Sequence, residues 1–230
     1  MRILPCGETA LLVECAPEQV ASLHAALLAS SLQLADVVPA ARTVLVRCAP
    51  SLLTSVREQL EAFLSAPLPP APAPAPGTTL TIEVRYDGPD LERVAVLTGL
   101  DATDVVAAHT GRPWRVAFGG FAPGFAYLEG GDERLAVPRR ETPRTEVPAG
   151  SVGLADGYSG IYPRSSPGGW QLIGRTTAVL WDAGREPPAL LRPGWWVRFV
   201  AVDQLASRWC VPGRCRWCRT QGGRASLPSA

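Results

Sequence analysis

Hydrophobic and polar residues follow two different patterns along the chain, one before residue 66 and another after residue 113. In the first part, apolar residues recur at every second position in short runs and at every third or fourth position in longer ones. These runs predict strands near 2–5, 9–15, 34–38 and 43–48, and helices at 17–30 and 51–65. This order predicts a small α+β domain whose helices lie on one face of a mainly antiparallel sheet.

The middle of the chain predicts one strand followed by two helices. Residues 79–86 alternate with period two, as a half-buried strand does, and both 89–99 and 101–111 show helical spacing. Asp101 stands in the N-cap position of the second helix, with Asp104 three residues later.

From residue 113 onward, short apolar runs alternate with Gly and Pro turns, which is the pattern of an antiparallel barrel or a compact sandwich. The runs lie at 114–118, 125–128, 135–138, 151–155, 170–174, 177–181 and 196–200. The fold class predicted for the whole chain is therefore an α+β N-terminal domain followed by a mainly-β barrel.

The segment 67-PLPPAPAPAPG-77 separates these two patterns. Alternating Pro and Ala stiffens a chain toward polyproline II and cannot join the interior of a helix or sheet. We therefore predict a domain at 1–66, a linker at 67–77, a barrel domain at 78–203 and a tail at 204–230. The tail holds five arginines and no acidic residue, which leaves a formal charge of −4 on the rest, and it is expected to be disordered.

Composition excludes several classes of function. All 22 basic residues are arginine, so mechanisms that need a Schiff-base or P-loop lysine are excluded. The two histidines, His24 and His109, cannot form a three-histidine metal site, and no metal site is predicted. The mildly acidic body argues against nucleic acid, and no apolar run reaches the roughly 18 residues of a membrane span. The expected location is the cytoplasm.

Glycine, proline and aromatic residues are concentrated in three segments, at 118–131, 143–153 and 160–176. One interpretation is structural, with Gly and Pro at barrel corners and aromatic residues filling the core. A second is a binding site for an anion or an amide-like ligand, because side chains that donate hydrogen bonds lie between the turns. A third is a protein interface, since Trp, Tyr and Arg are common at interface hot spots.

No familiar catalytic motif is complete in this sequence. The segment 119-GGFAPG-124 misses the G-x-G-x-x-G spacing, and Ser151 lies in AGSVG, where a nucleophile elbow begins with glycine. Cys210, Cys215 and Cys218 supply three thiols, one short of a structural zinc set. No catalytic residue is therefore assigned.

Six longer stretches carry a resemblance: GETALLVE (7–14), DVVPAARTVLV (36–46), VRYDGPDLERVA (84–95), GFAPGFAYL (120–128), PRRETPRTEVPAGSVGLA (138–155) and GIYPRSSPGGWQLIGRT (160–176). Through them the sequence resembles the family variously called the 5-oxoprolinase B subunit, allophanate hydrolase subunit 1 and the bacterial histidine-kinase inhibitor of sporulation. The resemblance implies that the barrel is cyclophilin-like. It also implies two partners, a homologous barrel protein like the 5-oxoprolinase C subunit and a third component like the 5-oxoprolinase A subunit.

The chemistry implied by the resemblance is the ATP-dependent opening of the pyroglutamate lactam to glutamate. A lactam shares the resonance of a peptide bond, so water attacks it slowly unless its carbonyl oxygen is first converted into a better leaving group. Phosphorylation achieves this, which makes ATP and Mg²⁺ the cofactors expected for the complex.

Motif position suggests which residues face the ligand: Arg144, Ser151, Tyr162, Gln171 and Arg175, with Arg139 and His109 as second choices. The two arginines Arg144 and Arg175 are expected to clamp an anion. Ser151 and Gln171 are expected to donate to an amide-like group, and Tyr162 to form a wall.

Three functions share this family fold, and fold does not decide among them. The leading hypothesis is the B subunit of an ATP-dependent 5-oxoprolinase that acts on a small lactam. The alternatives are a regulatory inhibitor of a sensor histidine kinase and the carboxyltransferase half of a biotin-dependent, urea-processing enzyme. Neighbouring reading frames would discriminate among the three.

Overall fold

The computed structural model describes residues 1–70 and 79–205 of the 230-residue chain. The proposed tail, with its three cysteines, falls outside the described residues from position 206 onward. Most of the proposed Pro/Ala linker also lies outside them. No helix in the described part of the chain is long and apolar enough to span a membrane.

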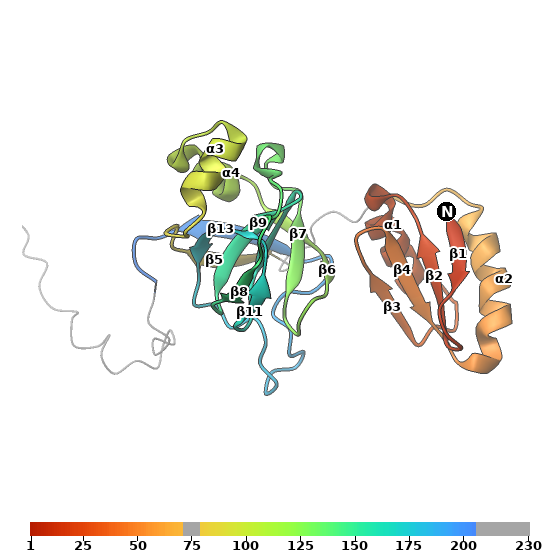
Figure 1. The fold of residues 1–230 in the computed structure, drawn as a ribbon. Coiled ribbons are helices and arrows are strands. Elements are labelled where there is room, and N and C mark those ends of the chain that lie inside the picture. The colour runs from red at the N-terminus through yellow and green to blue at the C-terminus, as the bar shows by residue number, and fades with distance from the viewer. Residues whose placement is uncertain (71–78, 206–230) are drawn as a thin grey trace, which may run out of the picture.

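The N-terminal unit is a four-stranded antiparallel sheet with two α-helices (Figure 1). Its elements are β1 (Arg2–Pro5), β2 (Ala10–Glu14), α1 (Pro17–Leu28), β3 (Asp36–Pro39), β4 (Thr43–Arg47), the 3-10 turn η1 (Pro50–Leu52) and α2 (Leu53–Leu64). The strand order is β1-β2-β4-β3, so the edges of the sheet are β1 and β3.

One core holds this unit together. Alternate residues of the two central strands are buried, because successive side chains of a strand point to opposite faces. Residues of both helices, spaced by three or four positions, cover that same face. The buried set comprises Leu11, Val13, Val20, Leu23, Leu27, Val44, Val46, Cys48, Val56 and Leu60.

The second unit is built on a seven-stranded sheet of order β12-β9-β10-β7-β6-β13-β5. Strands β13 and β5 run parallel, and all other neighbouring pairs are antiparallel. Its elements are β5 (Thr79–Val84), α3 (Leu91–Thr98), α4 (Ala102–Gly111), β6 (Trp114–Gly119), β7 (Ala126–Glu129), η2 (Glu133–Leu135), β8 (Arg144–Val147), β9 (Ser151–Ala155), β10 (Tyr158–Ile161), β11 (Ser166–Gly168), β12 (Gln171–Arg175) and β13 (Trp196–Ala201). Strands β8 and β11 form a separate ribbon.

The sheet closes into a barrel where the segment after β5 meets β12. Arg85 and Arg175 exchange two backbone hydrogen bonds of 2.9 Å, and the Asp90 N–H donates to Leu172 O at 2.9 Å. Gly174 is required at this seam, because a Cβ there would lie 2.6 Å from the carbonyl oxygen of Arg85. Gly88 faces the backbone of β12 in the same way.

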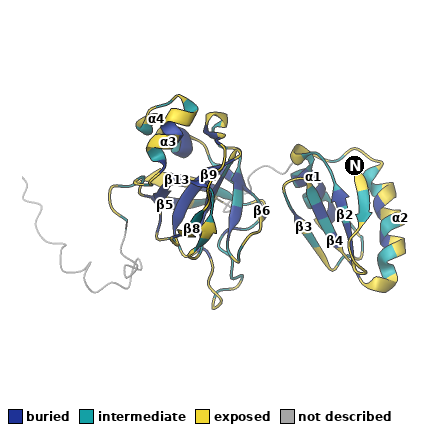
Figure 2. Cartoon of the chain, viewed as in Figure 1, coloured by how far each residue is buried: buried dark blue, intermediate teal, exposed yellow. Residues whose placement is uncertain are grey.

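The barrel core extends to one end of the barrel, where α3 and α4 cover it (Figure 1). Figure 2 shows the barrel strands buried and the outer faces of these helices exposed. The helix ends follow their sequence signals. Asp101 accepts the Asp104 N–H at 2.7 Å as the N-cap of α4, and Gly99 ends α3 at a φ of 69°.

A second apolar cluster, rich in aromatic rings, involves the β8–β11 ribbon. It contains Phe125, Val147, Ala155, Tyr162, Trp170 and Leu172. A Cβ on Gly160 would lie 2.8 Å from the Trp170 ring, and one on Gly168 would overlap the Tyr162 ring. Several glycines of this region therefore make room for aromatic packing, as the structural interpretation of the sequence proposed.

Two of the apolar runs in the barrel domain do not form strands. Leu135 is the last residue of η2, and residues 136–138 pair with no strand in the described part of the chain. Leu135 and Val137 are nevertheless both buried, as alternate residues of a strand would be. Val137 O accepts one hydrogen bond, from Asp156 N, and Pro138 has no N–H to donate. Within the described part of the chain, residues 177–181 make a single isolated bridge, between Trp181 and Ala189.

The strands that the sequence patterns missed are β8, β10 and β11. Strand β10 follows a two-residue turn, Asp156-Gly157, in which φ is 55° and 92°. Two positive φ values are typical of a type I′ hairpin turn, for which Asp-Gly is a favoured sequence.

Candidate functional site

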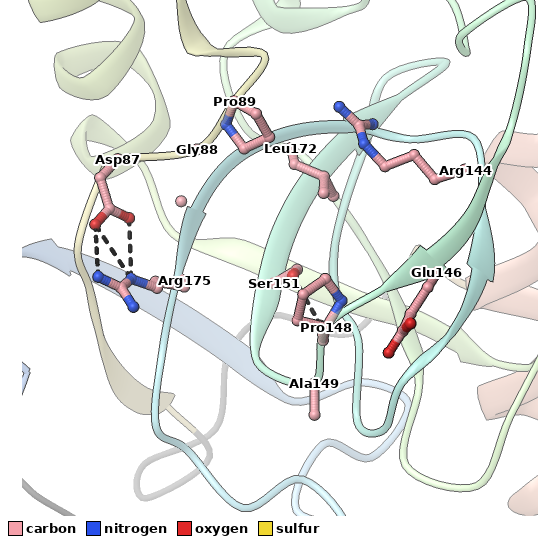
Figure 3. A pocket seen from close by; sticks show the side chains of 11 residues that line it. Asp87, Gly88, Pro89, Arg144, Glu146, Pro148, Ala149, Ser151, Leu172 and Arg175 are labelled. Atoms are coloured by element: carbon pink, nitrogen blue, oxygen red, sulfur yellow. Dashed lines mark hydrogen bonds and ion pairs between the residues drawn. The ribbon is translucent and has the colours of Figure 1, made fainter.

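A pocket of about 510 Å³ opens at the seam where the barrel closes (Figure 3). Segments distant in sequence meet there: residues 87–89 after β5, the stretch 144–151 that includes β8, and strand β12 from Leu172 to Arg175. The pocket therefore exists only because the sheet closes at this place.

Arg144, the first residue of β8, contributes a cation to the pocket. Its Nη2 donates to Asp90 Oδ1 at 2.7 Å, and Nη1 of Arg140 donates to the same oxygen at 2.9 Å. The other carboxylate oxygen, Oδ2, accepts the backbone N–H of Leu172 at 2.7 Å. Asp90 is only 3% exposed, so this is a buried carboxylate with three donors.

Arg175, the last residue of β12, faces Asp87 across the pocket wall (Figure 3). Its Nη2 donates to Asp87 Oδ2 at 2.8 Å, and Asp87 also pairs with Arg85 at 2.9 Å. The Arg175 side chain is about half exposed. An anion bound by Arg175 would compete with Asp87 for the guanidinium.

The pocket also offers a hydroxyl and a second carboxylate. Ser151 is buried, and its Oγ donates to Pro148 O at 2.7 Å. Glu146 accepts a 2.8 Å hydrogen bond from the Ser165 hydroxyl through Oε1. The lining thus mixes cations, carboxylates and a hydroxyl, a set suited to a small ligand that has both hydrogen-bond donors and acceptors.

Tyr162 and Gln171, also predicted to face the ligand, lie outside the pocket lining. Tyr162 is buried in the aromatic cluster, and this burial raises the pKa of its phenol. Gln171 is fully buried; its Nε2 donates to Pro138 O at 3.0 Å, and its Oε1 has no hydrogen-bond partner among the residues that the structure describes. Both side chains are packed in the protein interior and do not face the pocket.

The two second-choice residues are also elsewhere. Arg139 is exposed and pairs with Asp156 at 3.1 Å. His109 is fully buried inside the barrel, where its ring stacks on Phe199 with a centroid distance of 4.3 Å. Burial lowers the pKa of His109 to about 3, so the imidazole is neutral at physiological pH. Of the seven predicted residues, the pocket brings together Arg144, Ser151 and Arg175.

Sequence reasoning missed three acidic residues: Asp87, Asp90 and Glu146. The predicted residues were chosen as hydrogen-bond donors for an anion, and carboxylates are not donors. A signal was present, since Asp87 and Asp90 lie in VRYDGPDLERVA and Glu146 lies in a later long motif, at 138–155. Within residues 1–70 and 79–205, no three His, Cys, Asp or Glu side chains are grouped to hold a metal ion.

The fold and pocket define a closed barrel domain with a polar site at its seam. The chain belongs to the family described as carboxyltransferase domain, subdomain C and D, whose model matches residues 1–191. The resemblance drawn from the sequence motifs is confirmed.

Curated relatives carry a more specific name. The chain is 48% identical over 117 residues to the 5-oxoprolinase B subunit of Bacillus subtilis, covering 51% of this chain and 49% of that protein. It is 52% identical over 113 residues to the 5-oxoprolinase B subunit of Escherichia coli O157:H7, covering 49% and 52%. The match thus spans about half the length of these curated relatives. Urea amidolyase of Saccharomyces cerevisiae is 41% identical over 66 residues, covering 26% of this chain and 4% of that protein.

Solved structures share the fold. The crystal structure of TTHA0988 is 36% identical with a TM-score of 0.68, covering 85% of this chain and 40% of that one. The conserved uncharacterized protein PH0987 from Pyrococcus horikoshii is 38% identical with a TM-score of 0.54, covering 88% and 98%. Urea amidolyase of K. lactis, at 17% identity and a TM-score of 0.58, is alike in fold alone and is covered over 15% of its chain.

Proposed function

We propose that this chain is the B subunit of an ATP-dependent 5-oxoprolinase. In this proposal it opens pyroglutamate to glutamate together with a homologous barrel protein, the C subunit, and a third component, the A subunit. The observation that carries the proposal is the 47–52% identity to three curated proteins named as the B subunit of 5-oxoprolinase. The assembly would work in the cytoplasm, and its barrel would be of the cyclophilin-like type.

The chemistry of the pocket supports a small lactam as ligand. Pyroglutamate presents a carboxylate, a carbonyl oxygen and an amide N–H. Arg144 supplies guanidinium donors for the carboxylate or for a charged oxygen, and Glu146 supplies an acceptor for the N–H. Charge that develops on the lactam oxygen is stabilised by donors fixed before the reaction begins.

The residues present also fit the proposed cofactors. Guanidinium groups bind phosphate oxygens, and Arg144 and Arg175 both line the pocket. Mg²⁺ is usually bound through one or two carboxylates together with substrate phosphates, and Asp87 and Glu146 are the carboxylates available there. When bound, ATP would supply the phosphoryl group that activates the lactam oxygen.

The test is a product assay on the assembled complex. The chain is purified with its candidate partner proteins and incubated with ATP, Mg²⁺ and pyroglutamate. Glutamate and inorganic phosphate are expected in equal amounts, and neither without pyroglutamate. Phosphate release that ignores pyroglutamate would contradict the proposal.

Carboxyl transfer is the second candidate, favoured by the family description and by the likeness to urea amidolyase. If the first assay fails, the same purified proteins are tested with a carboxylated biotin carrier. This second function predicts that labelled carboxyl groups are transferred from the carrier to urea. The third alternative, inhibition of a sensor histidine kinase, stays a prediction that an autophosphorylation assay with added chain would test.

A further inference from the structure

We infer that Asp90 is the positioning residue for Arg144: its buried carboxylate fixes the guanidinium at the pocket, so anion recognition depends on a residue outside the lining. The identity of the anion rests on the proposed function. The positioning itself rests on the geometry around Asp90.

The place of Asp90 in the chain suggests a different use for its side chain. It is the N-cap residue of α3, where an aspartate ordinarily accepts a hydrogen bond from the first turn of its helix. Here the carboxylate makes no such bond. It turns instead toward Arg140, Arg144 and the backbone N–H of Leu172. A buried carboxylate is tolerated because these three donors surround it.

The carboxylate joins two parts of the barrel domain that share no ladder. Arg144 begins β8, which among the described strands pairs with β11 alone, in the separate ribbon, whereas Leu172 belongs to the barrel sheet. Asp90 contacts both, and the Arg140 N–H adds a 2.7 Å bond to Gly169 O. The guanidinium of Arg144 is therefore fixed relative to the barrel seam, with its side chain 21% exposed.

The direction of the effect separates positioning from simple electrostatics. Asp90 carries a negative charge next to Arg144 and repels a bound anion, so Coulomb's law alone predicts that its removal strengthens anion binding. If Asp90 positions Arg144, its removal weakens anion binding, because a freed arginine must lose side-chain entropy again when it binds. The two roles thus predict opposite signs for Asp90→Asn.

Arginine labelling tests the positioning in the isolated full chain and requires no activity. Phenylglyoxal reacts with accessible guanidinium groups, and peptide mass spectrometry reports each site. Asp90→Asn is expected to speed labelling of Arg144 by about fivefold or more, since a charge-assisted bond is lost. The matched control is Glu61→Gln, which frees Arg57 from an exposed pair in the N-terminal unit and is expected to change labelling of Arg57 less than about twofold.

A second variant tests the same inference if Asp90→Asn does not fold. Arg140→Gln leaves Arg144 as the one guanidinium on Asp90 Oδ1 among the described residues, while Leu172 N–H still binds Oδ2, so labelling of Arg144 is expected to slow by about twofold. Unchanged or faster labelling of Arg144 in Arg140→Gln, or unchanged labelling in a folded Asp90→Asn, would overturn the inference.

A double-mutant cycle then connects positioning to ligand binding. In the assembled complex, Asp90→Asn is expected to raise KM for pyroglutamate about tenfold with a smaller change in kcat, and to add nothing once Arg144→Gln is present. Independent, additive losses or a lowered KM would overturn the inference. A wild-type complex that ignores pyroglutamate overturns the proposed function instead, while the labelling experiment still decides the role of Asp90.

Discussion

The imidazole Nε2 of His109 lies 2.8 Å from the hydroxyl of Ser159, and both side chains are fully buried inside the barrel. The other ring nitrogen, Nδ1, is 2.7 Å from the hydroxyl of Tyr86. Burial raises the pKa of Tyr86 and lowers that of His109. A serine beside a histidine suggests a nucleophile, but no substrate reaches a fully buried hydroxyl. The three side chains form a network in which these buried polar groups hydrogen-bond to one another.

The network predicts a loss of stability in mild acid. The pKa of His109 is about 3 in the folded chain and about 6.5 when unfolded, so below pH 6.5 only the unfolded state gains this proton. Stability from this group is complete above pH 6.5 and falls by roughly 1.4 kcal/mol per pH unit toward pH 3. The contribution lost between pH 7 and pH 5 is about 2 kcal/mol. Urea unfolding followed by tryptophan fluorescence measures this loss of stability. All seven tryptophans follow residue 113, so the fluorescence change does not report on the N-terminal unit.

His109→Gln provides the control for that measurement. Glutamine does not titrate in this range, so the variant is expected to start less stable but to lose less stability between pH 7 and pH 5. Equal losses in the variant and the wild type would show that His109 does not cause the acid sensitivity.

The barrel seam predicts a strong effect at Gly174. An added methyl group in Gly174→Ala would lie 2.6 Å from a backbone oxygen of Arg85, which must move for the barrel to close. Overpacking of this kind is expected to cost at least about 2 kcal/mol of unfolding free energy. Gly111→Ala at the end of α4 is the matched control, since a Cβ there meets nothing within 4 Å. It is expected to be neutral or slightly stabilising, and similar losses in both variants would contradict the seam.

The N-cap of α4 predicts a smaller effect. Asp101→Ala removes the acceptor for the Asp104 N–H and is expected to cost about 1 kcal/mol, whereas Asp101→Asn keeps an acceptor and is expected to cost less than about 0.5 kcal/mol. Urea unfolding of the two variants measures the difference. A loss as large for asparagine as for alanine would mean that the charge of Asp101, rather than its hydrogen bond, stabilises the helix.

Much of the fold was predictable because local signals agree with it. The period-two run in β5, the helical spacing in α3 and α4 and the cap at Asp101 all appear as expected. Failures arose where a residue is buried without a ladder, as at Val137, since burial alternates there while hydrogen bonding does not. Strand β10 could have been predicted from the Asp156-Gly157 turn that precedes it.

The candidate site was only partly predictable. Arg144, Ser151 and Arg175 belong to motifs rich in donors, and they meet in one pocket. The link between Asp90 and Arg144 spans 54 residues and depends on closure of the barrel, so no local pattern indicates it. Gln171 has the residue type of a ligand contact, but strand alternation turns it into the barrel core.

In the proposed function, this chain binds a lactam through the pocket at the barrel seam. The kcat/KM for pyroglutamate-dependent ATP hydrolysis by the assembled complex, carrying Arg144→Ala or Arg139→Ala, tests this binding. Loss of a charged donor in the pocket is expected to lower kcat/KM by about 100-fold for Arg144→Ala. Arg139→Ala, which breaks an exposed pair outside the pocket, is expected to change it less than about threefold. Equal losses in the two variants, or a wild-type complex without pyroglutamate-dependent turnover, would contradict the claim.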